Sequence, residues 1–180
     1  MLISRPAGGR RRAGATSVEF ALVAVVLFML LFGIYEYGRY LFIKHITNNA
    51  AHDAARFAVV HTGGPTMATD PVTIDEQSIR DVFLTGKVSG HPTVYGRGMF
   101  GMQHNIEGLR VYVFAVPDAD LYASPPNLAP AGKPVWTTAK FHQKVAVRVE
   151  GTYRPVVTSL VGLGSSYPLT VTVLMGCEGN

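Results

Sequence analysis

The feature that most constrains this chain is a long apolar stretch near its N-terminus. Residues 20–32 carry no polar side chain, and they lie within a longer apolar run, 18–35, whose only acid is Glu19. At about 1.5 Å of rise per residue, this run would form a helix roughly 27 Å long, close to the thickness of about 30 Å of a hydrocarbon core. The stretch therefore predicts a transmembrane helix over residues 18–35.

Basic residues before the apolar run predict how the helix is oriented. Arg10, Arg11 and Arg12 precede it closely, and Arg5 lies further upstream. Positively charged flanks are retained on the cytoplasmic side of a membrane, so residues 1–14 are expected to form a cytoplasmic leader without regular structure. The rest of the chain is expected on the outer side of that membrane.

The acid at the start of the apolar run needs an explanation. An unpaired carboxylate at the bilayer centre costs about 2.5 to 3.5 kcal/mol, and less near the interface, so Glu19 is expected to have a partner. Gly14 lies five positions before Glu19. A cut after Gly14 would make Ala15 the first residue and Glu19 the fifth, and it would remove every arginine of the leader.

The sequence RRRAG followed by ATSVEF resembles the processing signal of type IV pilins and pseudopilins. The resemblance implies that a prepilin peptidase cuts between Gly14 and Ala15. It also implies that Glu19, supported by Phe20, pairs with the new amine of a neighbouring pilin-like subunit. The alternative is an uncleaved signal anchor in which Gly14 is accidental and Glu19 lies at the headgroup level.

The helical pattern continues well beyond the apolar run. Residues 36–60 contain no proline, and the next clear helix breakers are at 63–65. A single helix over residues 15–60 would be on the order of 69 Å long, so its second half is expected to be soluble. Glu36 is expected to pair with Arg39 or Tyr40 at helical spacing. Tyr35 and Tyr37, together with Tyr40, are expected to form an interfacial aromatic belt.

Two patterns on this helix resemble TadE-type minor pseudopilins of the tight-adherence (Flp) pilus system. The first is a G-x-x-E-x-G-R box formed by Gly33, Glu36, Gly38 and Arg39. The second is a run formed by Asn49, Ala50, Ala51, Ala54, Ala55 and Arg56. Residues 141–178 resemble the same family more loosely. The resemblance implies an assembly role in a bacterial inner membrane, with residues 61–180 as an external, periplasmic domain.

The external domain reads as an α+β fold. Thr73 and Glu76 form a capping box, and the apolar residues that follow predict a helix that stops at Gly86. Alternating residues predict strands at 109–116, 144–153 and 169–175. These strands are expected to form a small antiparallel sheet, with the alanine-rich half of the long helix and the shorter helix on its apolar face.

The remaining segments of the external domain are expected to be connections. Residues 86–108 and 117–134 hold many of the glycines and prolines, so they are interpreted as loops. A short helix is expected over residues 155–163. Trp136 is expected to fold onto the sheet, the alternative being a partner-binding surface formed with residues 122–130.

Composition excludes several classes of function. The net charge of +4 comes from 16 Lys and Arg against 12 Asp and Glu, and 16 minus the four leader arginines equals 12. A processed chain would be neutral, so the basic leader indicates topology rather than nucleic-acid binding. Cys177 is the single cysteine, which excludes an intramolecular disulfide. His45 and His52 lie on one helix face and His61 follows in the turn region, but a metal site would need a third ligand from elsewhere, so no metal site and no cofactor are expected.

No pattern indicates catalysis. Asp118 and Asp120 are paired carboxylates, but they follow a strand in what reads as a solvated turn. The serines lie outside any nucleophile-elbow pattern, and the glycine-rich piece YGRGMFGM lacks the strand-to-helix context of a phosphate-binding loop. The sequence therefore predicts a pilin-like structural subunit rather than an enzyme, with an uncleaved membrane-anchored binding domain as the alternative.

Overall fold

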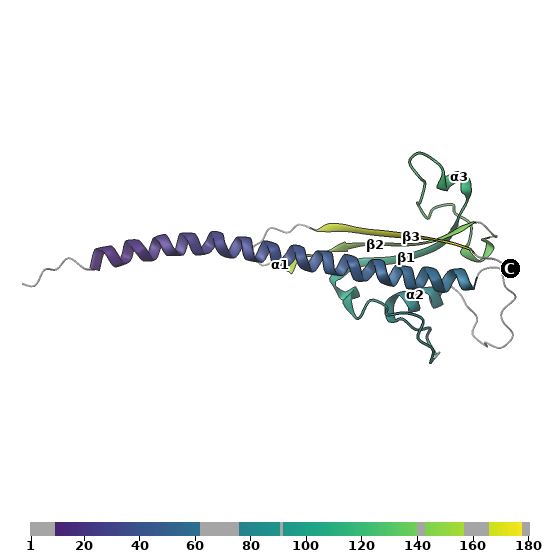
Figure 1. Cartoon of the computed structure of the whole chain (residues 1–180), viewed down its shortest axis with the longest axis horizontal. Helices are drawn as coiled ribbons and strands as arrows, with labels where there is room; N and C mark the ends of the chain where they lie inside the picture. The colour runs from purple at the N-terminus through teal and green to yellow at the C-terminus, as the bar shows by residue number, and fades with distance from the viewer. Residues whose placement is uncertain (1–9, 62–75, 91, 140–142, 157–165, 178–180) are drawn as a thin grey trace, which may run out of the picture. The chain divides into compact units, whose positions relative to one another are not determined.

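The computed structural model describes residues 10–61, 76–90, 92–139, 143–156 and 166–177, with side chains from Gly14 onward (Figure 1). Its helices are α1 (Arg10–Val60), α2 (Glu76–Thr85) and the short α3 (Asp118–Leu121). Two 3₁₀ turns, η1 (Met102–Asn105) and η2 (Trp136–Thr138), lie between them and the strands. The strands are β1 (Ile106–Val116), β2 (Lys144–Tyr153) and β3 (Tyr167–Gly176). The expected α+β class is confirmed.

The chain divides into two compact units, residues 1–39 and residues 40–180. The first contains the N-terminal part of α1, and the second contains the remainder of α1 together with the sheet. Helix α1 begins at Arg10, so residues 10–14, which were expected to lack regular structure, are helical. Arginine and alanine favour helix, and the nearest upstream proline is Pro6, so the sequence offers no barrier to an earlier start.

The three strands form one antiparallel sheet in the order β1-β2-β3, as the alternating pattern predicts. In the central rows Val113 lies opposite Val147, and Val147 lies opposite Val173. Strand β1 is longer than expected, and it includes Gly108, which was assigned to a loop. A register shift between Glu107 and Arg110 explains the difference, because Gly108 adopts a φ of 63° and forms a bulge that interrupts the alternation.

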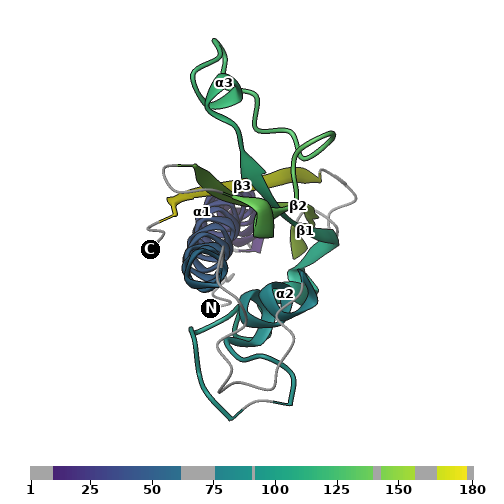
Figure 2. The same ribbon diagram turned by 90° about the vertical axis from the view of Figure 1, so that its right-hand side faces the viewer.

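One face of the sheet packs against the 40–60 part of α1 and against α2, as Figure 2 shows. The alanine rows of α1 lie in this core: Ala50 is 1% exposed, and Ala51, Ala54, Ala55 and Ala58 are completely buried. Opposite them are the inward valines of the strands, including Val145, Val147 and Val149. Because alanine has the smallest apolar side chain, this helix face contributes little side-chain volume to the core. The predicted role of the alanine rows in packing is confirmed.

A smaller cluster covers part of the opposite face of the sheet. Phe114, Val116 and Ala146 are buried there, with Leu121 and Leu128 of the segment that contains α3 packed against them. That segment was expected to be a loop around a solvated Asp118 and Asp120, but these two residues lie in the one-turn helix α3. Trp136 is 2% exposed and belongs to the main core, which confirms that it folds inward.

An ion pair between Asp120 of α3 and Lys133 closes the segment between these two residues into a loop. The Lys133 ammonium lies 2.7 Å from Oδ2 of Asp120, and the Asn127 side chain donates a hydrogen bond to Oδ1 of the same carboxylate. The hydrogen bond from Lys133, with a smaller contribution from Asn127, holds the pKa of Asp120 below its ordinary value. The carboxylate therefore remains charged and closes this segment on itself.

Helix α2 ends where the sequence predicts, whereas its expected N-cap and the helix expected after β2 fall largely on residues that the structure does not describe. Helix α2 ends at Thr85, and Gly86 follows with a φ of 78°, so the expected stop is confirmed. Glu76 pairs with Arg80 at 3.0 Å within the helix. The expected N-cap Thr73 and most of the helix expected over 155–163 lie outside the described residues.

Enlarging a buried alanine of α1 should destabilise the second unit. Ala54→Leu adds volume where Ala54 has no exposed surface, so we expect the free energy of unfolding to fall by about 1 to 3 kcal/mol. Chemical denaturation of the full chain in detergent, followed by the fluorescence of the single buried Trp136, measures the change. The control Ala119→Leu lies at an exposed position of α3 and should stay within about 0.5 kcal/mol of the parent. Equal effects at the two positions would contradict the packing role.

Candidate assembly site

The predicted processing and assembly residues lie on the first half of α1. Gly14, Ala15, Glu19 and Phe20 are all exposed, and Phe20 retains 73% of its accessible surface. From Gly14 to Phe20 the helix rises by roughly 9 Å, so these residues occupy its first described turns. A Cβ added at Gly14 would meet no atom within 4 Å, which means that the fold itself does not require glycine there.

Glu19 stands in apolar surroundings. Leu22 and Val23, which share its helix face at three- and four-residue spacing, are 67% and 59% exposed. Within the described part of the chain, the Glu19 carboxylate forms no ion pair or hydrogen bond. A charge on such a surface requires either water or an external cation when the helix leaves water.

No described residue of the chain covers the helix around Glu19. Among the described residues, one helix could cross a membrane by length and composition: the segment Gly14–Val60 holds an 18-residue window of mean hydropathy 2.5, none of which is buried. An apolar surface of this extent is unfavourable in water. Lipid chains, or the helices of other subunits, would remove it from solvent.

The G-x-x-E-x-G-R box follows about 26 Å further along the helix axis, measured from Glu19 to Glu36. Arg39 Nη1 donates to Glu36 Oε1 at 3.3 Å, which confirms the predicted pair. Glu36 is 8% exposed. At Gly33 and Gly38, an added Cβ would meet nothing within 4 Å, so these glycines leave room on the helix surface. Two residues of the box, Glu36 and Arg39, therefore form an ion pair with each other, and Glu19 is not part of it.

The three tyrosines after the apolar run differ in their exposure and contacts. Tyr35 and Tyr37 are each 64% exposed, in keeping with an interfacial role. Tyr40 is different, because its ring lies 5.4 Å from the ring of Tyr153 and 6.2 Å from that of Tyr167. Tyr40 therefore also packs against the strand ends of the second unit, a contact that the sequence did not predict. Helical spacing turns residue 40 toward the ends of β2 and β3, and this could not be known before the strands were placed.

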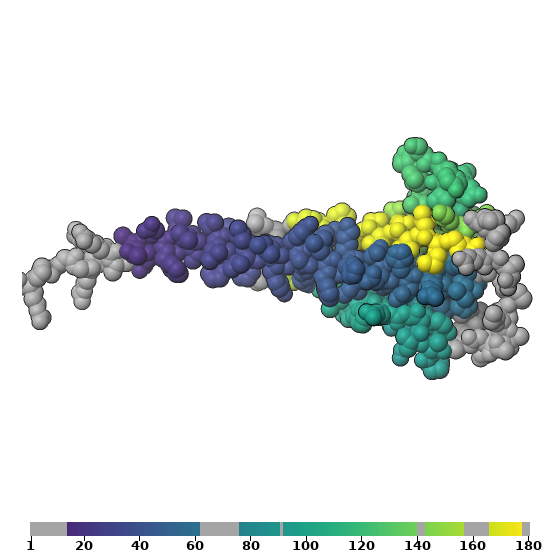
Figure 3. All heavy atoms as spheres, in the orientation of Figure 1, coloured from purple at the N-terminus to yellow at the C-terminus, as the bar shows by residue number. Residues whose placement is uncertain are grey.

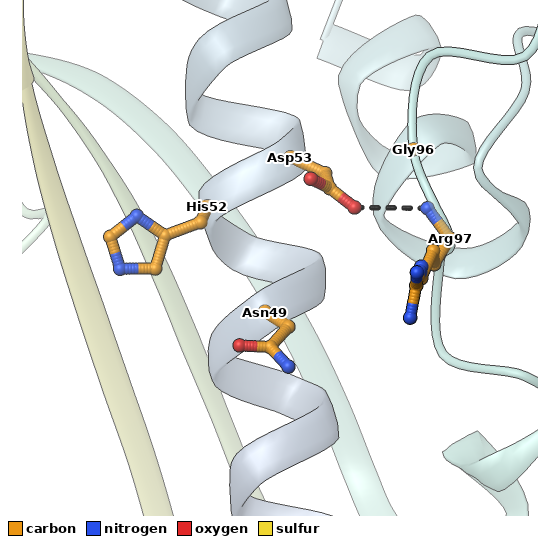
Figure 4. Close-up of a pocket in the computed structure, with 5 residues that line it drawn as sticks. All are labelled: Asn49, His52, Asp53, Gly96 and Arg97. Atoms are coloured by element: carbon orange, nitrogen blue, oxygen red, sulfur yellow. Dashed lines mark hydrogen bonds between the residues drawn. The ribbon is translucent and has the colours of Figure 1, made fainter.

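A second group of polar residues forms an open hollow in the second unit, shown in Figure 4. Asn49, His52 and Asp53 come from α1, and Gly96 and Arg97 come from the segment after α2. The Arg97 amide donates to Asp53 Oδ2 at 2.9 Å, while the His52 ring points away from Asp53. A Cβ at Gly96 would lie 2.5 Å from Asp53 Oδ2, so glycine is needed for this close approach. The contact fastens the segment to the helix.

The hollow does not bring together groups for catalysis or metal binding. His45 contacts Asn49 at 3.1 Å, and His61 Nδ1 lies 2.7 Å from the Phe57 carbonyl oxygen, so both rings have local partners. Within the described ranges, no three His, Cys, Asp or Glu side chains are grouped as metal ligands. Sequence reasoning missed Asp53. The available signal was an acid within an alanine-rich helix face, where an unpaired charge is unusual.

The comparison with known families addresses the first half of α1 and its continuation. Residues 14–56 match the family model TadE, described as TadE-like protein. The match confirms the predicted resemblance over this segment. The TadE-like family is a pilus-related structural family, so the match suggests a Tad pilus-associated protein. No curated protein and no solved structure matches the chain.

The TadE-like segment contains every residue predicted for processing and assembly. It begins at Gly14 and ends at Arg56, so it includes Glu19, the glycine box and the alanine rows as far as Ala55. Its second part, from Tyr40 onward, belongs to the unit that contains the sheet. The same segment therefore holds an exposed apolar surface and a buried packing surface.

Removing the Asp53 carboxylate should loosen the second unit. Asp53→Ala deletes a charge-assisted hydrogen bond to the Arg97 amide, and we expect a loss of about 1 to 2 kcal/mol in the free energy of unfolding. Trp136 fluorescence during denaturation of the full chain measures it. His52→Ala is the matched control, because His52 is exposed on the same turn and points away from the contact, and it should change stability by less than about 0.5 kcal/mol. A loss at His52 as large as that at Asp53 would refute this assignment.

Proposed function

We propose that this chain is a pilin-like minor pseudopilin that acts in assembly of a tight-adherence (Flp) pilus. The observation that supports the proposal most directly is an acid, Glu19, that has neither an ion-pair partner nor a covering among the described residues. It lies on an apolar helix, five residues after Gly14 and within the TadE-like segment. An ordinary membrane anchor gains nothing from a carboxylate at this position, because the charge opposes insertion.

Processing by a prepilin peptidase after Gly14 would change the charge of the helix start. The cut removes the leader arginines and leaves a free amine on Ala15. In the proposed assembly, this amine on one subunit neutralises Glu19 on its neighbour. An ion pair between two subunits would place the acid and the amine in apolar surroundings at a much smaller cost than either group alone.

The apolar surface of the first unit provides the packing for assembly. Its side chains are exposed all around the helix, so lipid can be replaced by the helices of other pilin-like subunits without loss of burial. Gly33 and Gly38 leave space on this surface where a neighbouring backbone can come close. Partners in this proposal are the prepilin peptidase, other pilin-like subunits, the assembly machinery and the lipid bilayer.

We infer the membrane arrangement from the leader arginines. The chain would insert once into the bacterial inner membrane, with residues 1–14 in the cytoplasm and residues 61–180 in the periplasm. The transmembrane part would be about residues 18–35 of the helix over residues 15–60. The proposal requires no cofactor, no enzymatic activity and no nucleic acid.

N-terminal sequencing tests the processing step. In cells with the native peptidase, the mature protein should begin at Ala15. Gly14→Leu should retain the leader, because a peptidase subsite that accepts glycine excludes a branched side chain. The substitution is suited to this purpose, since the first Cβ meets no atom of the chain itself. A parent protein that keeps Met1 in membranes would favour the alternative, an uncleaved anchored binding domain.

Glu19 should be required for assembly and not for insertion. Glu19→Ala and Glu19→Gln both remove the charge, so we expect normal membrane recovery with loss of incorporation into pili by at least about tenfold, a deficit of roughly 1.4 kcal/mol or more. Quantification of the subunit in sheared pili and in membranes measures the two steps. Ser17→Ala, a change of a neighbouring polar residue, serves as the control and should assemble normally. Normal piliation by both Glu19 variants would remove the proposed role.

A further inference from the structure

The α3 loop, residues 118–133, presents one tyrosine that the fold leaves uncovered. Tyr122 retains 80% of its accessible surface, more than any other large apolar side chain among the described residues, those of the apolar run included. Figure 3 shows this loop, in green, standing out from the second unit above β3, in yellow. Tyrosine combines a large apolar ring with a polar hydroxyl group, and it is enriched among the residues that anchor protein interfaces. The Tyr122 side chain is therefore available to a partner.

The loop is braced so that this side chain keeps its position. The Asn127 amide donates to the Asp120 carbonyl oxygen at 2.9 Å, and the Lys133 ammonium pairs with the Asp120 carboxylate at 2.7 Å. The Lys133 side chain is only 4% exposed, so water screens this ion pair little. From the sheet, Arg148 Nη1 donates to the Leu128 carbonyl oxygen at 2.8 Å. A segment that is ordered before it binds loses less conformational entropy on binding, which favours a specific contact.

The hollow on α1, shown in Figure 4, has the size and the side chains to accept a phenol ring. Its volume is about 350 Å³, within the range of about 300 to 1,000 Å³ that ligand pockets occupy. Asn49 and Asp53 lie on the middle of the helix surface, with His52 on one side and Arg97 on the other. An aromatic ring placed there would lie between an imidazole and a guanidinium, both of which stack on aromatic faces. The Asn49 side-chain amide can form a hydrogen bond with a phenol oxygen.

The charges of the loop and of the hollow are complementary. Asp118 is exposed and lies one turn before Tyr122, whose amide donates to the Asp118 carbonyl oxygen at 3.0 Å. At the hollow, Arg97 is exposed, and Arg56 is exposed one turn after His52. An acid that enters beside the tyrosine ring would therefore face two arginines, and opposite charges of this kind favour and orient association.

A second hollow, on the outer face of the sheet, fits the loop less well. Its charged lining residues are Glu107, Glu150 and Arg110, and Thr170 of β3 also contributes. Two of these three charges are acidic, so Asp118 would meet like charges there. Its lining contains neither an aromatic ring nor an imidazole. Electrostatics therefore favours the hollow on α1.

One chain cannot place its own loop in its own hollow. The α3 loop packs on one face of the sheet, whereas α1 packs on the other face, as Figure 2 shows. The contact must therefore join two chains. Because the loop and the hollow are different surfaces, the contact is heterologous, and it leaves a free loop at one end and a free hollow at the other. Such a contact can continue from copy to copy.

We propose that the α3 loop of one copy of this chain binds the α1 hollow of a second copy, with Tyr122 between His52 and Arg97 and with Asp118 beside the arginines. The contact joins the second units head to tail. It goes beyond the proposed function, because it requires neither cleavage after Gly14 nor the carboxylate of Glu19.

Cross-linking between cysteines at the two rims detects the contact in the full-length protein. Ser124→Cys lies at an exposed position of the α3 loop, and His45→Cys lies one turn before Asn49 on the exposed side of α1. The double variant is produced in membranes without other pilin-like subunits and treated with a short bismaleimide linker. It should give a ladder of dimers, trimers and larger products. The parent, whose Cys177 is buried, gives the background.

The size of the products decides between the arrangements. A double-cysteine variant with no product above the background would overturn the proposal. Dimers without larger products would show a closed, reciprocal pair and would overturn the head-to-tail arrangement, because a heterologous contact of this kind does not stop at two copies.

Substitutions in the double-cysteine protein test which side chains make the contact. Tyr122→Ala and Arg97→Ala should each lower the cross-linked fraction by at least about tenfold, and Arg97→Ala keeps the main-chain amide that Asp53 binds. Tyr122→Phe keeps the ring and should retain more product than Tyr122→Ala. Val135→Ala, at a position that is 61% exposed, is the matched control and should behave as the parent. Trp136 fluorescence reports whether each variant folds, and an unchanged ladder in folded Tyr122→Ala would refute the contact.

A second cysteine pair and a second host test the choice of site and of partner. Ser124→Cys combined with Thr170→Cys probes the hollow on the outer face of the sheet. Products from this pair, with none from the His45→Cys pair, would overturn the choice of site. Products that form only when other pilin-like subunits are present would overturn the choice of a second copy as the occupant.

The Gly14→Leu substitution separates this inference from the proposed function. In the double-cysteine protein it should leave the ladder unchanged, because the contact lies within the second units. A ladder from a parent protein that keeps its leader would refute processing and retain the loop contact. Cleavage after Gly14 and dependence of piliation on Glu19, without a ladder, would leave the pilin-like role and refute the loop contact.

Discussion

The second unit depends on a single core that the alanine-rich face of α1, within residues 40–60, shares with the sheet. Five alanines of this helix are buried in the same core as the inward-facing valines of the strands. Asp53 then fastens the segment after α2 to the same helix, and the Tyr40 ring packs beside Tyr153 at the end of β2. The helix is therefore both the continuation of the apolar segment and the support on which the sheet is built.

The sequence predicted the strands and helices where side-chain periodicity is strong. Valines alternate from Val145 to Val149 in β2, threonines alternate with valines from Thr170 to Val173 in β3, and the alanine rows repeat at four-residue spacing, so the burial of the valines and alanines follows from pattern alone. Local reasoning failed where a single backbone conformation changes the register. Gly108 was assigned to a loop because glycine commonly breaks a strand, yet a bulge lets β1 continue through it.

Side-chain periodicity could not predict contacts between segments that are distant in the sequence. The contact of Tyr40 with the ends of β2 and β3 joins residues far apart in the sequence, and Asp53 gains its role only because Gly96 lets the chain pass closely. For the candidate assembly site, the sequence supplied Gly14 and Glu19 by resemblance. The structure adds that Glu19 has no internal partner among the described residues, and that the apolar surface around it is uncovered.

The early start of α1 bears on how a peptidase would reach the bond after Gly14. Because the helix begins at Arg10, that peptide bond lies inside a hydrogen-bonded turn rather than in an extended strand of chain. A protease that binds its substrate in extended form must wait for the first turns to fray, which terminal helical residues do readily. Access to the bond would then be governed by the local opening equilibrium of these turns, and residues that strengthen the N-terminal helix would slow maturation without touching the enzyme.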